Sequence, residues 1–147
     1  MKKLLLIPFL ALATQTLAHV TIRNEANSIE SISNKSDTFR MVVPVSSGAI
    51  TQVRLVIPSN VTFLYLEPVS GWSYELIKNP EGKVTEVVYK GSATAGEVIR
   101  FPFIAKNPEK SDTLVEYKAY VTQKDGTIVP FDGSEAAKGY APRILLK

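Results

Sequence analysis

The sequence predicts an all-β fold, and two observations lead to this prediction. Polar and apolar residues alternate with a period of two in run after run, and these runs are rich in β-branched and aromatic residues. No sustained helical periodicity accompanies them, and polar clusters containing glycine separate several of the runs, as in chains that turn between antiparallel strands. Nearly all of the chain should therefore be β-structure.

Seven segments carry the strand pattern, and TQVRLVI shows it most clearly. Val53, Leu55 and Ile57 fall on one face of the expected strand. Gln52 and Arg54 fall on the other face, so that one side packs on a core and the other meets water. We expect strands at 38–43, 51–57, 61–66, 72–77, 83–89, 98–105 and 113–121.

The segments between the strands predict how they pair. NPEGK at 79–83 and QKDGT at 123–127 should form hairpins, because Gly82 and Gly126 can adopt the positive φ of tight turns. Pro102 cannot donate a ladder hydrogen bond, so its strand should be an edge strand or carry a bulge. The whole pattern predicts a single domain, an antiparallel two-sheet sandwich of immunoglobulin-like or cupredoxin-like shape. Two polar segments should be loops: 24–36 and 134–141.

The first residues have the layout of a secretory signal peptide. Two lysines precede an apolar run, Leu4–Leu12, which is too short to span a bilayer, and small residues close the segment at Ala18. Cleavage after Ala18 is favoured, and cleavage after Ala13 is the alternative. We expect a signal peptide at 1–18, a β-sandwich domain at 19–147, and a periplasmic or secreted protein with no membrane anchor in the mature chain.

The net charge belongs largely to this leader. Removal of its two lysines lowers the Lys and Arg count from 17 to 15 against 14 Asp and Glu, so the formal charge falls from +3 to +1. No run of five or more basic residues remains. Neither nucleic acid nor an anionic membrane surface is an expected partner.

The reactive residue types are scarce. The chain has one histidine and no cysteine, so a zinc site of clustered His and Cys ligands is excluded, and a catalytic triad would have to be built on that histidine. No glycine-rich phosphate loop or dinucleotide fingerprint is present. The few carboxylates near turns have the pattern of solvated residues. We therefore expect a protein that is not an enzyme.

His19 is that single histidine, and it would become the first residue after cleavage at Ala18. Its free α-amine and imidazole Nδ1 could then chelate one metal ion, and two nitrogen ligands of this kind suit Cu(II). A solvated terminal residue without a role is the alternative. Met41 is the only methionine left after processing, which argues against a dedicated Cu(I) carrier.

Seven sequence motifs run in order through nearly the whole mature chain, and the ordered set is more specific than any one motif. The motifs are HVTI at 19–22, TFRMVVP at 38–44, QVRLVIP at 52–58, GWSYE at 71–75, GKVTEVVYKG at 82–91, GEVIRFPF at 96–103 and TLVEYKAYVTQKDGTIVPFDG at 113–133. On these motifs the chain resembles the YcnI-like family of exported copper-binding domains.

The resemblance implies a β-sandwich that holds Cu(II) through the amine and imidazole of His19. A glutamate completes the site in copper-binding members, and its position corresponds to Asp37, counted back from Pro44. A tryptophan lies beside the metal in those members, and its position corresponds to Phe131. Aspartate is one methylene shorter, and phenylalanine lacks the indole N–H, so both are departures from the family pattern.

Two hypotheses about function follow. The first is an exported copper-binding protein for copper homeostasis or delivery, with a copper-trafficking protein as its partner. The second is a non-metal β-sandwich module that recognises a protein or cell-envelope partner through its loops. A copper-brace oxidative enzyme ranks behind both, because such sites usually add a second histidine.

Overall fold

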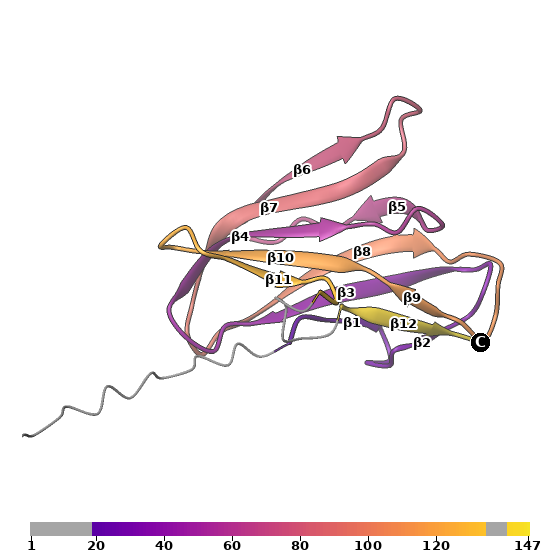
Figure 1. The fold of residues 1–147 in the computed structure, drawn as a ribbon, viewed down its shortest axis with the longest axis horizontal. Coiled ribbons are helices and arrows are strands. Elements are labelled where there is room, and N and C mark those ends of the chain that lie inside the picture. Colours follow the sequence, from indigo (N-terminus) through magenta and orange to yellow (C-terminus); the bar gives the residue numbers. More distant parts are fainter. Residues whose placement is uncertain (1–18, 135–140) are drawn as a thin grey trace, which may run out of the picture.

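The structure, a computed structural model, describes residues 19–134 and 141–147, so the predicted signal peptide lies outside the described residues. All regular elements in this part of the chain are β-strands, arranged in stacked layers (Figure 1). Among the described residues, no helix is long and apolar enough to cross a membrane. The strands are β1 (Thr21–Asn24), β2 (Glu30–Ser31), β3 (Ser36–Pro44), β4 (Ala49–Val56), β5 (Thr62–Leu66), β6 (Ser73–Lys78), β7 (Val84–Thr94), β8 (Val98–Lys106), β9 (Leu114–Glu116), β10 (Lys118–Gln123), β11 (Ile128–Phe131) and β12 (Arg143–Leu146).

Two antiparallel sheets make the sandwich. The first has the strand order β1-β3-β8-β5, and the second has the order β11-β10-β4-β7-β6. Every pairing within them is antiparallel. The predicted all-β, antiparallel two-sheet sandwich is confirmed. A small third sheet, β2-β12-β9, joins them, and its β2–β12 pairing is parallel, which the alternation pattern did not predict.

The inner faces of the two sheets form one hydrophobic core. Val53 and Leu55 are fully buried, whereas Arg54 between them is half-buried, so the facing expected for β4 is confirmed. Aromatic rings fill the middle of the core, where Phe103 lies 5.6 Å from Phe39 and 5.9 Å from Tyr117 between ring centroids. Stability therefore rests on hydrophobic burial and strand pairing, without any disulfide.

Both predicted hairpins are present. Asn79 N donates to Lys83 O across the turn between β6 and β7, and Gly82 has a φ of 83°. Gln123 N donates to Thr127 O across the turn between β10 and β11, and Gly126 has a φ of 91°. A residue other than glycine adopts these φ values only with strain, which explains why glycine occupies both turns.

Pro102 does not lie on an edge strand, so the first of the two alternatives is wrong, but the pairing of its strand with β5 does contain a register shift, between Phe63 and Tyr65. Its strand, β8, lies between β3 and β5. Pro102 O accepts from Glu67 N, one residue beyond the end of β5. In an extended strand, the N–H and C=O groups of one residue point to the same neighbouring strand. The ring nitrogen of Pro102 therefore also faces the end of β5, and its missing N–H removes no hydrogen bond to β3.

The segment at 113–121 forms two strands, not one. β9 pairs with β12 and β10 pairs with β4, so the chain changes sheets at Tyr117, whose N–H donates to Pro142 O. The polar segment at 24–36 is not entirely a loop, because it contains β2. The other predicted loop falls mainly on 135–140, outside the described residues.

Candidate functional site

His19 is an exposed residue two positions before the start of β1. Val20, the next residue, is only 2% exposed and belongs to the core. The backbone is therefore fixed to the sandwich one residue after the histidine. β1 pairs with β3 so that Thr21 lies opposite Val42, and continuation of this register brings His19 level with Pro44, at the end of β3.

A surface pocket of about 270 Å³ lies beside His19. Its walls come from β1, from Ile29, and from the segment that leads into β12, where Ala141 and Pro142 contribute. Two guanidinium groups, those of Arg23 and Arg143, also line it. The pocket therefore places two positively charged side chains near the imidazole of His19.

Asp37 takes part in a hydrogen-bond network at the start of β3. Ser31 Oγ donates to Asp37 Oδ2 at 2.6 Å, and Thr38 N donates to Asp37 Oδ1 at 2.8 Å. Asn107 Nδ2 donates to Ser31 Oγ at 2.7 Å and to Ile32 O at 2.9 Å. Ser31 and Asn107 are the two buried polar side chains of the described chain, and Asp37 satisfies the hydroxyl of one of them. This network ties β2 and the loop after β8 to β3.

The structure does not bring Asp37 beside His19. The two strands are antiparallel, so the beginning of β1 lies near the end of β3, whereas Asp37 stands at its beginning. Seven residues separate Asp37 from Pro44, which corresponds to about 23 Å along an extended strand. A carboxylate at that distance cannot share an ion with the His19 imidazole.

Phe131 ends β11 and packs in the core, where it is 4% exposed. It pairs with Ala119 on β10. The chain that follows it runs towards the pocket, because a Cβ placed on Gly133 would lie 3.9 Å from the Ala141 Cβ. The structure thus places Phe131 two residues from a segment that contacts the pocket wall, in a position where its ring contributes to the core.

Asp132 is the carboxylate on that segment, and its oxygens are already engaged. Tyr120 Oη donates to Asp132 Oδ2 at 3.1 Å, and both the amide and the hydroxyl of Ser134 donate to Oδ1. The hydroxyl and amide of Ser134 hold the pKa of Asp132 below its usual range. The described parts of the chain, 19–134 and 141–147, contain no group of three His, Cys, Asp or Glu side chains arranged to hold a metal.

Comparisons with known proteins agree with the fold. No family model matches the chain. The chain is 33% identical over 123 residues to the copper-binding protein CutI of Bacillus subtilis (strain 168), an alignment that covers 82% of this chain. This similarity supports the resemblance of the chain to the YcnI-like family. It spans 58% of the length of this relative, so the relative contains sequence without a counterpart here.

A solved structure supports the fold of the chain independently. An uncharacterized protein from Nocardia farcinica, described as having an immunoglobulin-like fold, superposes with a TM-score of 0.68 at 24% sequence identity. The match covers 87% of this chain and 97% of the other. At this identity the likeness concerns the fold alone, and it favours the immunoglobulin-like description of the sandwich.

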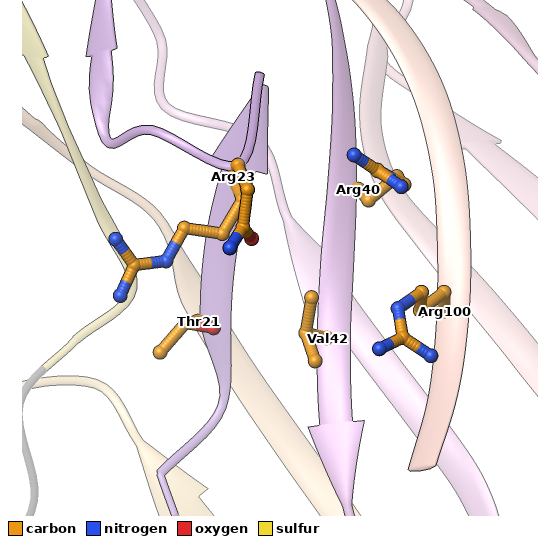
Figure 2. Close-up of a pocket in the computed structure, with 6 residues that line it drawn as sticks. Thr21, Arg23, Arg40, Val42 and Arg100 are labelled. Carbon is orange, nitrogen blue, oxygen red and sulfur yellow. The ribbon is translucent and has the colours of Figure 1, made fainter. Parts of the chain in front are cut away.

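The sequence did not predict one cluster of charged side chains in this chain. A groove of about 420 Å³ lies on the outer face of the first sheet, and we call it the arginine groove. Figure 2 shows Arg23, Arg40 and Arg100 on three neighbouring strands, with Val42 between Arg23 and Arg100. The three arginines occupy outward-facing positions on three different strands, and only the strand register shows that these positions are neighbours. The residues that line the groove are Thr21, Arg23, Asn27, Arg40, Val42 and Arg100.

Proposed function

We propose that this protein is an exported copper-binding protein that holds Cu(II) through the α-amine and imidazole of His19 after cleavage at Ala18. The observation that carries the proposal is the 33% identity to a protein named for copper binding. The resemblance of 1–18 to a signal peptide supports it, because only cleavage would give His19 a free amine.

The position of His19 fits a chelate of this kind. Its side chain is exposed, while the buried Val20 holds the backbone in place, so amine and imidazole would stand together at the surface beside a pocket. His19 would supply both protein nitrogens. Because the described residues contain no cluster of carboxylates that could hold a metal, solvent or an external donor would complete the coordination. Such an open shell suits storage or delivery of copper to a trafficking partner, and we propose binding in place of catalysis.

The test starts from the exported product. The protein is expressed with its own leader, its N-terminus is sequenced, and an electron paramagnetic resonance spectrum is recorded with one equivalent of Cu(II). We expect an N-terminal His19 and a tetragonal spectrum with nitrogen coupling. Two variants serve as controls: a glycine added before His19 blocks the amine geometry, and His19→Ala removes the imidazole.

A product that begins elsewhere, or an unchanged Cu(II) affinity in both variants, would refute the proposal. The non-metal binding module would then be the better account. That account predicts that His19→Ala still retains its partner in a pull-down from the cell envelope, because recognition would lie in the loops and not in the histidine.

A further inference from the structure

The arginine groove is built on rigid backbone. Its floor and walls form two cross-strand rows on the outer face: Thr21–Val42–Arg100 and Arg23–Arg40–Pro102. Between these rows, the inward-facing residues Ile22, Met41 and Phe101 are fully buried. The three strands are therefore fixed by the core, and the arginine side chains project from positions that cannot drift apart.

The groove carries concentrated, uncompensated positive charge. Three arginines and no carboxylate line it, and Figure 2 shows the guanidinium groups of Arg40 and Arg100 beside Val42, whereas that of Arg23 points away from them. Within the described residues, the ion pairs join Arg54 to Glu86 and Lys147 to Glu30, so none neutralises Arg23 or Arg100. Arg40 differs, because its Nη2 donates to the carbonyl oxygens of Asn24 at 3.2 Å and Glu25 at 3.0 Å, which orients its guanidinium without cancelling its charge.

This arrangement is unfavourable for the free protein. Arg40 and Arg100 are diagonal neighbours on adjacent antiparallel strands, with Cα atoms about 7–8 Å apart, a separation at which long side chains of like charge still reach and repel each other. Guanidinium groups do not lose their proton to relieve the repulsion. Uncharged residues would serve the sheet at least as well, which indicates that the charges serve a ligand.

We propose that the arginine groove binds an oxyanion of the phosphate class. Arginine forks match tetrahedral phosphate oxygens through paired, charge-assisted hydrogen bonds. The groove, at about 420 Å³, accommodates a phosphate together with the group attached to it. The ligand is therefore either a free phosphate or pyrophosphate ion or the phosphate of a lipid headgroup.

Neighbouring carboxylates define where the anion sits. Glu25 and Glu67 share an adjoining pocket with Arg40, on its side away from Val42. An anion is repelled from that side, and the Arg23 guanidinium points away from Val42 (Figure 2), so Arg40 and Arg100 make the principal contacts, on the side of Arg40 that faces Val42. The site is independent of copper, and its test needs no added metal.

The experiment measures binding of inorganic phosphate and pyrophosphate by calorimetry at constant ionic strength, with chloride as the balancing ion. We expect saturable binding that weakens at least tenfold in the Arg40→Gln/Arg100→Gln double variant. The matched control is Lys90→Gln, which removes an exposed cation from β7 on the other sheet and should leave binding unchanged. Arg100→Gln alone, at an exposed position, provides a second variant if the double variant fails to fold.

Vesicle sedimentation separates the two sources of the phosphate. Binding to vesicles of phosphatidylglycerol but not of phosphatidylcholine, reversed by pyrophosphate, identifies a headgroup ligand. Saturable binding of the free ions without vesicle binding identifies a soluble ligand. Binding that does not saturate, or that is equal in the wild type and in both arginine variants, would overturn the proposal.

Discussion

Replacement of Asp37 separates a structural carboxylate from a metal ligand. In Asp37→Ala, two hydrogen bonds to the carboxylate are lost, from Ser31 Oγ at 2.6 Å and from Thr38 N at 2.8 Å. Hydrogen bonds to a charged group contribute about 1.5–3 kcal/mol each, and the buried Ser31 hydroxyl loses its acceptor. Because Asp37 is only partly buried and such terms are not additive, we expect a loss of about 3 kcal/mol in the free energy of unfolding.

The assay is urea denaturation followed by fluorescence, paired with a Cu(II) titration. With a slope of about 2 kcal/mol per molar urea, the midpoint should fall by about 1.5 M. Asp37→Asn keeps an acceptor and should cost less. The control Glu109→Ala, an exposed carboxylate in the loop after β8, should change stability by under about 0.5 kcal/mol.

Copper affinity provides the decisive comparison. Since Asp37 lies about 23 Å along β3 from the level of His19, Asp37→Ala should leave the Cu(II) affinity of the folded protein unchanged. A tenfold weaker affinity together with an unchanged urea midpoint would refute the structural role and restore Asp37 as a ligand.

Three further perturbations test the packing and the electrostatics. Gly91→Ala should lower the thermal midpoint by several degrees, because the added Cβ would lie 2.4 Å from the indole of Trp72. An unchanged midpoint would show that the indole moves aside freely. Phe103→Ala should cost about 3–5 kcal/mol in a denaturant melt, because the ring is 1% exposed and contacts three other rings; a cost under 1 kcal/mol would contradict this packing. The pKa of Asp132 is lowered by Ser134, so its stabilising effect is present above the ordinary pKa of about 3.9 and is lost as pH falls. Asp132→Asn should therefore reduce the fall in urea midpoint between pH 6 and pH 3, and an identical fall in both proteins would count against it.

The strands and hairpins could be predicted because their signals are local. Alternation identified β4 through Val53 and Leu55, and the turn glycines identified both hairpins before any pairing was known. Pro102 could not be placed, since its tolerance inside a sheet depends on where β5 ends. The division of the segment 113–121 into two strands at Tyr117 could not be predicted either, because both halves keep the same alternation although they pair in different sheets.

The candidate site was harder to predict because it depends on contacts between distant parts of the chain. A count along the sequence matched Asp37 to a glutamate of the family. Antiparallel pairing, however, puts the beginning of β3, where Asp37 lies, at the end of the strand far from His19. The same pairing brings Arg23 next to Arg40, 17 residues away in sequence, and adds Arg100 from β8. No composition or charge-run criterion detects such a cluster, since the three arginines are isolated along the chain.

The burial of Val20 has a consequence for the rate of metal exchange at the chelate that we propose for His19. A residue anchored one peptide from the core moves little, because successive Cα atoms are only about 3.8 Å apart. Most of the conformational entropy cost of ordering the chelate is incurred when the sandwich folds. The amine and imidazole nitrogens are therefore preorganised before the metal binds. A donor or acceptor protein would then meet a fixed target, and the transfer rate would be set by the approach of the partner, without a wait for the N-terminus to become ordered.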